Sequence, residues 1–159
     1  MEEKSENSAS SCPFCAIAAG KLPASIVYRD ADWLALMDIH PLRKGHVLII
    51  PQQHLAHLAD LGDNQRDQLL ALAARLLQAQ QQAGFAAGGA NLLLNDGSAA
   101  NQHVPHLHLH CIPRRPGDSL RLIAGLISRV FGFFGLKAAR VRLDEQAALL
   151  RSELTRIGP

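Results

Sequence analysis

The segment His106-Leu107-His108-Leu109-His110 carries histidine at every second position, and histidine can bind metals, attack electrophiles and move protons near neutral pH. If this segment is a β-strand, its side chains alternate between two faces, so the three imidazoles share one face about 6.6 Å apart. Leu107, Leu109 and Cys111 then share the other face and can enter a core. Because imidazoles repel each other when protonated and need partners when buried, stability gives no reason to gather three of them. The segment is therefore a candidate functional site.

Two kinds of chemistry fit three imidazoles at this spacing. They can bind a catalytic metal ion together, or one can act as a nucleophile or general base while its neighbours orient it. The spacing alone leaves both alternatives open. Cysteine is clustered too, since two of the three lie in the segment Cys12-Pro13-Phe14-Cys15. Metal binding or reduced thiols explain an odd number of cysteines better than a disulfide framework does.

The composition is typical of one folded domain. The chain has 159 residues, of which 48% are hydrophobic and 19% charged, and this excludes wholesale disorder. Its 16 basic and 14 acidic side chains give a net charge of +2, too balanced to predict non-specific nucleic-acid binding. Arg121 and Arg129 interrupt the longest apolar stretch, 120–136, so we expect no membrane span. Residues 1–11 are polar and acidic, so we expect a short disordered lead rather than a targeting sequence, and a soluble, cytoplasmic protein.

Hydrophobic periodicity and turn residues predict the elements that position these motifs. Helices are expected at Pro13–Ala19, Asn64–Ala83, Leu120–Phe131 and Asp144–Ile157. Strands are expected at Ser25–Arg29, Trp33–Asp38, His46–Pro51, Asn91–Asn95 and His106–Ile112. Asp63 is the expected N-cap of the long helix, and Gly84 is its expected stop. One long helix among short turns favours an α+β fold with a mostly antiparallel sheet over a doubly wound fold.

Five segments occur in the order that one known family shows. They are Cys12-Pro13-Phe14-Cys15-Ala16-Ile17, Asp38-Ile39-His40-Pro41, the segment 45–54 that begins Gly45-His46 and ends at His54, Asn95-Asp96-Gly97 and His106-Leu107-His108-Leu109-His110-Cys111-Ile112. Together they resemble the histidine triad, or HIT, family of nucleotide hydrolases and transferases. The resemblance spans residues 12–114.

The resemblance implies both a fold and a reaction. The fold would be a five-stranded antiparallel sheet with one long helix and C-terminal helices, in a homodimer whose two sheets join. Residues 12–116 would form the HIT domain, and 117–159 a helical extension packed on it. The protein would be a nucleotide hydrolase or nucleotidyl transferase that cleaves a purine nucleotide at the α-phosphate. Its substrate would be a dinucleoside polyphosphate or a nucleoside phosphoramidate, and a covalent nucleotidyl-histidine would form on the way.

The resemblance also assigns roles around the phosphate. His108 would be the nucleophile, with a backbone carbonyl fixing the proton on its other nitrogen. His110 would contact the phosphate, and Asn95 would help to hold the phosphate oxygens, together with main-chain N–H groups near Gln102 and His103. Gln102 matches a polar residue near the phosphates or the leaving group. His103 departs from the family, where Ser, Thr or Glu is common, and it can assist the leaving group or face solvent.

For the nucleoside, the resemblance implies a carboxylate and an apolar pocket. Asp38 would accept hydrogen bonds from the ribose hydroxyls. The walls around the base would come from Phe14, Ile17, Leu36 and Met37.

Relatives with a Cys-x-x-Cys pair place a zinc ion on that pair and two histidines. The matching residues in this chain are Cys12, Cys15, His54 and His106. Two thiolates and two imidazoles suit the tetrahedral geometry of a structural Zn²⁺ site. If His106 holds zinc, its role is structural, and this strengthens the assignment of His108 as the nucleophile.

Two other functions stay open. A nucleotide-binding interaction module would keep the pocket and have little turnover, and a metal-dependent hydrolase would use all three triad histidines as ligands. The apolar stretch 120–134 can form a helix that packs on the sheet, joins a dimer or lies on a membrane surface. His40, His46 and His57 are expected to be structural or surface residues.

Overall fold

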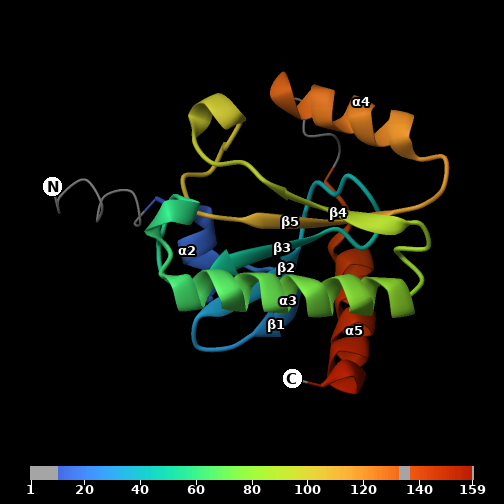
Figure 1. Cartoon of the computed structure of the whole chain (residues 1–159), viewed down its shortest axis with the longest axis horizontal. Coiled ribbons are helices and arrows are strands. Elements are labelled where there is room, and N and C mark those ends of the chain that lie inside the picture. The colour runs from blue at the N-terminus through green and yellow to red at the C-terminus, as the bar shows by residue number, and fades with distance from the viewer. Residues whose placement is uncertain (1–10, 133–136, 159) are drawn as a thin grey trace, which may run out of the picture.

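Five antiparallel strands form one sheet in the order β1-β2-β3-β5-β4 (Figure 1). The computed structural model describes residues 11–132 and 137–158. Its strands are β1 (Ile26–Arg29), β2 (Trp33–Met37), β3 (Val47–Pro51), β4 (Gly89–Leu94) and β5 (Leu109–Arg114). Its helices are α2 (Pro13–Ala18), α3 (Asp63–Gln82), α4 (Ser119–Val130) and α5 (Arg140–Ile157), with short 3-10 turns η1 (Leu58–Asp60) and η2 (Ser98–Ala100). The predicted α+β fold with a five-stranded antiparallel sheet is confirmed; the disordered lead predicted for 1–11 falls, except for Ser11, outside the described residues.

The two faces of the sheet are covered by different helices. Alternate residues of a strand face opposite sides, so Trp33 and Met37 of β2 face one way and Leu36 the other. The first face packs against α3 and α5 and forms the larger core. The opposite face holds a smaller cluster in which Phe14 and Ile17 of α2 pack against β2 and β3. Figure 1 shows α4 on the side of the sheet opposite to α3, so α2 and α4 both lie on the face that carries the histidines.

The histidine segment begins before its strand, which corrects the predicted range His106–Ile112. The ladders of β5 with β3 and with β4 both end at Leu109, and the N–H of Leu107 instead donates to Leu55 O at 2.6 Å. The predicted alternation nevertheless holds, since Leu107, Leu109 and Cys111 belong to the larger core. The sheet pairing of β5 therefore begins at Leu109, and His106 and His108 lie in the segment before the strand.

Helix ends also differ from the prediction. Gly62 is the N-cap of α3, with its N–H donating to Gln65 Oε1 at 3.0 Å, whereas Asp63 is already helical. α5 begins at Arg140, four residues before the predicted Asp144, and its first turn already places Leu143 in the larger core. β4 begins at Gly89, two residues before the predicted start.

The turn into β3 requires glycine. Gly45 has φ +84°, and a Cβ at this position would lie 2.6 Å from Cδ2 of Phe85. A side chain here would therefore be strained in its backbone and would collide with a buried ring. This turn fixes the start of β3 and, with it, the position of His46.

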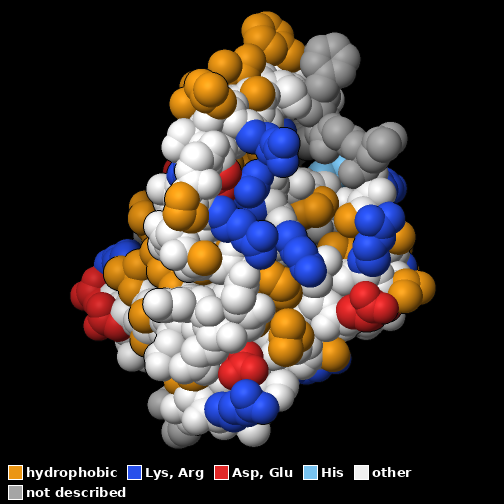
Figure 2. All heavy atoms as spheres, turned by 90° about the vertical axis from the view of Figure 1, so that its right-hand side faces the viewer, with side chains coloured by type: hydrophobic (Ala, Val, Ile, Leu, Met, Phe, Trp, Pro, Cys, Tyr) orange, Lys and Arg blue, Asp and Glu red, His pale blue; other side chains and the backbone are white. Residues whose placement is uncertain are grey.

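Helix α4 leaves most of its apolar side chains exposed. Only Leu122 is buried, while Leu120, Ile123, Ile127 and Val130 are exposed. Figure 2 shows hydrophobic side chains gathered at the top of the molecule, the end that α4 occupies in Figure 1, above a group of Lys and Arg side chains. Within the described residues, no helix is both long and apolar enough to cross a membrane.

Candidate active site

A cavity of about 240 Å³ lies on the histidine face of the sheet, between α2, the end of β2, the loop after β4 and helix α4. Nine of the predicted site residues line it: Phe14, Ile17, Leu36, Met37, Asp38, Asn95, His103, His108 and His110. The side chain of Met37 belongs to the larger core on the other face, so Phe14, Ile17 and Leu36 supply the apolar wall. The predicted Gln102 and His106 are not among the residues that line this cavity.

The hydrogen bond of His108 fixes which nitrogen can react. Its Nδ1 donates to the backbone carbonyl of His106 at 2.7 Å, so the proton of the neutral imidazole is on Nδ1 and the lone pair is on Nε2. Burial lowers the pKa of His108, which favours the neutral form. The ring of Phe14 lies against it, with ring centroids 5.3 Å apart. His108 is thus an oriented, unprotonated imidazole in the wall of the cavity.

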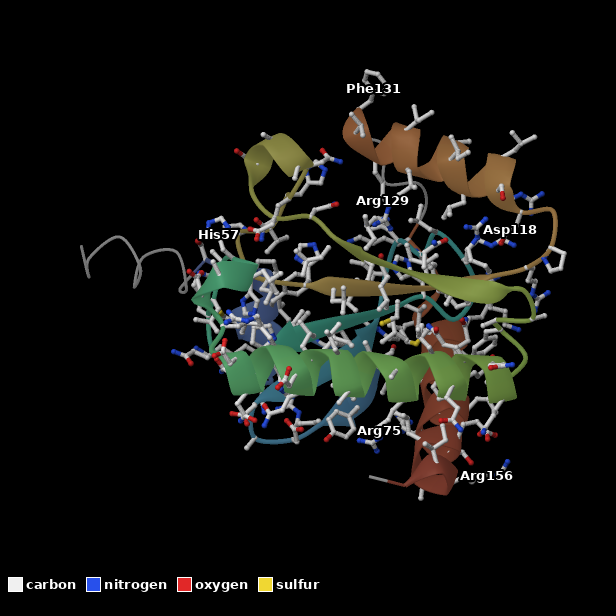
Figure 3. All side chains as sticks on the ribbon, in the orientation of Figure 1. His57, Arg75, Asp118, Arg129, Phe131 and Arg156 are labelled. Carbon is white, nitrogen blue, oxygen red and sulfur yellow. The ribbon has the colours of Figure 1, made fainter. Side chains whose placement is uncertain are left out.

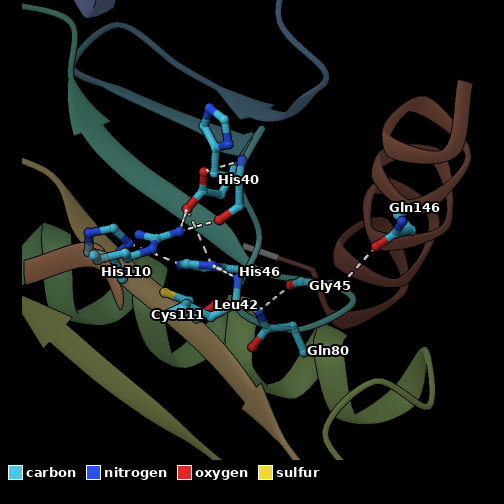
Figure 4. A network of polar contacts seen from close by, with 10 residues as sticks. His40, Leu42, Gly45, His46, Gln80, His110, Cys111 and Gln146 are labelled. Atoms are coloured by element: carbon cyan, nitrogen blue, oxygen red, sulfur yellow. Dashed lines mark hydrogen bonds and ion pairs between the residues drawn. The ribbon is translucent and has the colours of Figure 1, made fainter. Parts of the chain in front are cut away.

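His110 is oriented by a second histidine, His46, which directly precedes β3. Nδ1 of His46 accepts the backbone N–H of Leu42 at 3.2 Å and also lies 3.3 Å from Oδ2 of Asp38. Because it accepts this N–H, Nδ1 carries no proton in the neutral ring, and the proton of His46 is on Nε2. That Nε2 then donates to Nδ1 of His110 at 3.0 Å, so the proton of His110 is on its own Nε2 (Figure 4). Burial lowers the pKa of His46 to about 4 and also lowers the pKa of His110, so both rings are neutral at pH 7. His110 can therefore donate a hydrogen bond from Nε2.

Asp38 forms an ion pair with an arginine that comes from α4. Nη2 of Arg129 donates to Oδ2 of Asp38 at 2.9 Å and also to the carbonyl of His40, and Figure 3 shows Arg129 pointing from α4 toward the sheet. The backbone N–H of His40 donates to Oδ1 of Asp38 at 2.8 Å. Burial opposes ionisation, but His46, Arg129 and this N–H outweigh it and lower the pKa of Asp38 to about 2. Because His46 is neutral at pH 7, the guanidinium of Arg129 is the permanent positive charge beside Asp38.

The loop after β4 is held in place by polar side chains. Oε1 of Gln102 accepts the N–H of Gly97 at 2.8 Å, and its Nε2 donates to the carbonyl of Ala56 at 2.9 Å. The main-chain N–H of Gln102 donates to Gly97 O at 3.2 Å, so it is used within the loop. Gln102 therefore ties the loop after β4 to the segment before η1, and its place near the phosphates or the leaving group stays a prediction. Asn95, whose Nδ2 lies 3.5 Å from Asn101 O, remains in the cavity wall.

A second cluster of possible ligand atoms lies next to Phe14, whose ring centroid is 5.6 Å from that of His106. It consists of Cys12, Cys15, His54 and His106, whose ligand atoms all lie within 4.8 Å of one another. Nε2 of His106 donates to Pro51 O at 2.9 Å, which leaves its Nδ1 as a lone pair 3.4 Å from Cys12 Sγ and 3.5 Å from Cys15 Sγ. Nδ1 of His54 lies 3.2 Å from Cys15 Sγ. In a tetrahedral zinc site, sulfur and nitrogen ligands lie about 3.5 Å apart, so these four residues fit a structural Zn²⁺ ion.

Three residues at this site were not among the predicted site residues. Arg129 was noted only as a charge that interrupts an apolar stretch, and nothing in its local pattern indicates a partner 91 residues away. His46 was expected to be a structural or surface residue; it is buried, and its contact with His110 was not predicted. Asn101 lines the cavity with a left-handed φ of 67°, and its place among turn residues could have indicated that conformation.

Comparison with known proteins adds the following. The model of the HIT domain family matches residues 19–117. An uncharacterised HIT-like protein of Mycobacterium tuberculosis is 39% identical over 118 residues, covering 74% of this chain and 81% of that protein. The adenosine 5'-monophosphoramidase of Schizosaccharomyces pombe is 36% identical over 115 residues, covering 72% of this chain and 82% of the enzyme. A solved structure of a Zn-bound histidine triad family protein from Mycobacterium smegmatis is 35% identical, with a TM-score of 0.75, and covers 94% of this chain and 96% of that one.

Proposed function

Since the chain belongs to the HIT domain family, we propose that it hydrolyses nucleotides at the α-phosphate, with His108 as the nucleophile and a nucleoside phosphoramidate as the substrate. The observation that carries this proposal is the bond from Nδ1 of His108 to the carbonyl of His106, which leaves Nε2 unprotonated. The phosphoramidase names of several yeast relatives favour a phosphoramidate over a dinucleoside polyphosphate.

In the first step, Nε2 of His108 attacks the α-phosphorus and forms a P–N bond. The bond from phosphorus to the leaving nitrogen breaks, and this nitrogen keeps the electron pair and takes a proton from water. Nε2–H of His110 donates to a phosphate oxygen, where negative charge grows. Nδ1–H of His108 becomes part of a cationic ring, which the carbonyl of His106 stabilises.

In the second step, water attacks the phosphorus and displaces His108. The P–N bond breaks, its electron pair returns to Nε2, and the water loses a proton to solvent. One water is consumed overall, and the products are a nucleoside monophosphate and an amine. Imidazole suits both steps because it is a good neutral nucleophile and, bonded to phosphorus, a good leaving group.

The nucleoside would bind on the α2 side of the cavity. Asp38 is ionised and keeps lone pairs for ribose hydroxyls beyond the two that accept from His40 N–H and Arg129. Phe14, Ile17 and Leu36 supply an apolar wall for the base. Because the wall offers few polar groups, it supports binding of a flat purine by burial more than by base-specific hydrogen bonds.

A bound Zn²⁺ ion would hold Cys12, Cys15, His54 and His106 together and would supply no chemistry in the reaction. His106 lies two residues before His108, and its carbonyl accepts the bond that orients the nucleophile. The cluster therefore helps to orient His108, because it fixes the backbone carbonyl of His106 to which Nδ1 of His108 donates.

A homodimer remains part of the proposal. β4 is an edge strand, and its Leu92 is exposed. Pairing of two β4 edges would satisfy the free backbone groups of each. Sedimentation that shows a monomer at micromolar concentration would contradict this part.

The activity is tested with adenosine 5'-phosphoramidate and a diadenosine polyphosphate as separate substrates. We expect the wild-type protein to release AMP from the phosphoramidate and His108→Ala to lose at least about 1,000-fold in kcat. Equal turnover by the two proteins would contradict the role of His108. Tight AMP binding without cleavage of either substrate would favour a binding module instead.

A further inference from the structure

A second cavity of about 270 Å³ lies on the far side of His110 from the α2 wall. Its walls come from β4, η2 and α4, and the residues that line it are Leu93, Asn95, Ala100, Asn101, His110, Leu126, Ile127, Arg129 and Val130. Four of these residues, Asn95, Asn101, His110 and Arg129, also line the nucleotide cavity. The two cavities therefore meet at the polar groups that would hold the phosphate.

The second cavity is apolar, whereas its junction with the nucleotide cavity is polar. Beyond the shared polar residues, the second cavity is lined by aliphatic side chains from three elements: Leu93 on β4, Ala100 on η2, and Leu126, Ile127 and Val130 on α4. Its lining includes one cationic side chain, Arg129, which is already paired with Asp38. A polyphosphate chain needs several cations or N–H donors, whereas an apolar group gains by burial on aliphatic walls.

Helix α4 supplies this wall from outside the matched part of the family. The HIT domain match ends at residue 117, and α4 begins at Ser119. Figure 3 shows that Arg129 points toward the sheet while Phe131 points away from it. The C-terminal half of α4 thus faces the junction, whereas Leu120, two helical turns before Ile127, lines neither cavity.

We propose that the second cavity holds the leaving group, and that the preferred substrates are nucleoside phosphoramidates of amines with an aliphatic or aromatic substituent. This inference rests on the proposed function. With the nucleoside against α2 and the phosphate at His110, the group that departs from phosphorus lies between Leu93 and Ile127. It leaves as a free amine after the P–N bond breaks, and water supplies its proton.

The experiment compares two adenosine 5'-phosphoramidates, one N-methyl and one N-hexyl. Methylamine and hexylamine have nearly the same basicity, so the chemical step is matched and the ratio of kcat/KM values reports contacts of the alkyl chain. We expect the wild-type protein to prefer the N-hexyl substrate by about 10-fold or more. Diadenosine tetraphosphate should be a poorer substrate than either.

Variants locate the contact. Ile127→Asp and Leu93→Asp should each reduce the N-hexyl preference by about 10-fold, because a carboxylate beside an alkyl chain removes the gain from burial. Both side chains are partly solvent-exposed, so the fold tolerates the change. Leu120→Asp is the matched control, on the same helix but outside both cavities, and should keep the wild-type ratio.

The outcomes separate this inference from the proposed function. Turnover of both substrates with equal kcat/KM, or an N-hexyl preference that survives Ile127→Asp and Leu93→Asp, would overturn the leaving-group cavity alone. Turnover of neither substrate by the wild-type protein would overturn the proposed function and the inference with it.

Discussion

The guanidinium of Arg129 lies 2.9 Å from Oδ2 of Asp38, so a helix near the C-terminus forms an ion pair with the residue proposed to bind the ribose. Both side chains are largely buried, with 13% and 9% of their surfaces exposed. The pair sits between the two cavities, and Arg129 lines both. α4 thus takes part in the site although the family match stops before it.

Removing this cation should weaken nucleotide binding. We expect Arg129→Ala to raise KM for adenosine 5'-phosphoramidate about tenfold, because Asp38 loses the charged partner that orients it. Both residues act through one contact. Arg129→Ala should therefore raise KM less in a protein that already carries Asp38→Ala than in the wild-type protein. Arg121→Ala, an exposed arginine on the same helix, is the control. Additive effects in the Asp38 and Arg129 cycle would show that the pair is not a functional unit.

The cysteine-histidine cluster should bind one zinc ion per chain. Zinc at a hundred times its Kd would stabilise the fold by about 2.7 kcal/mol, so chelation should lower the melting temperature of the wild-type protein. Cys12→Ser should abolish both the bound zinc and the effect of the chelator, whereas Cys111→Ala, which removes the buried thiol outside the cluster, should retain both. Purified protein without zinc, even after refolding in its presence, would exclude the site.

Buried His46 should make stability depend on pH. Burial lowers its pKa from 6.5 to about 4, so between these values the unfolded chain binds a proton that the folded chain does not. Its contribution is present above pH 6.5 and is lost as the pH falls toward 4, on the order of 3 kcal/mol in all. Urea unfolding from pH 7.5 to 4.5 should therefore show a smaller loss of stability for His46→Gln than for the wild-type protein. Equal slopes would mean that His46 is not buried in its neutral form.

A buried amide ties α3 to the turn before β3 and to β5. Nε2 of Gln80 donates to the carbonyls of Gly45 and Cys111, at 2.8 and 3.0 Å (Figure 4). Gln80→Leu would leave both carbonyls buried without this donor, and we expect a loss of about 2–4 kcal/mol in the free energy of unfolding. Gln81→Leu, at the exposed neighbouring position, should change it by less than about 0.5 kcal/mol. Equal effects in urea titrations would contradict the role of Gln80.

The sequence was most informative where chemistry and local pattern coincide. Alternation in the histidine segment predicted which side chains enter the core, and the core holds Leu107 and Cys111 as expected. Hydrophobic periodicity and turn residues predicted the strands and the long helix. The family resemblance brought together Cys12 and His106, which lie 94 residues apart and which no local pattern connects.

The rest depends on tertiary contacts that leave little local signal. Arg129 becomes a site residue only because α4 crosses the histidine face of the sheet, and the path of α4 is set by packing after Pro116. The family resemblance placed Gln102 near the phosphates or the leaving group, and only tertiary contacts show that its side chain also bonds Gly97 and Ala56. His46 was expected to be a structural or surface residue because its partner His110 lies on β5, and the register of β5 against β3 decides whether the two rings meet.

The central claim is that His108 becomes covalently attached to the nucleotide, and mass spectrometry after a rapid quench tests it most directly. No Lys or Arg lies between Arg75 and Arg114, so trypsin releases residues 76–114 as one peptide, and fragmentation within it locates the adduct. With an adenosine phosphoramidate, we expect this peptide to gain one adenylyl group on His108 within the first turnover, and none in His108→Asn. Turnover without any adduct, or an adduct on His103 or His110 that persists in His108→Asn, would contradict the account.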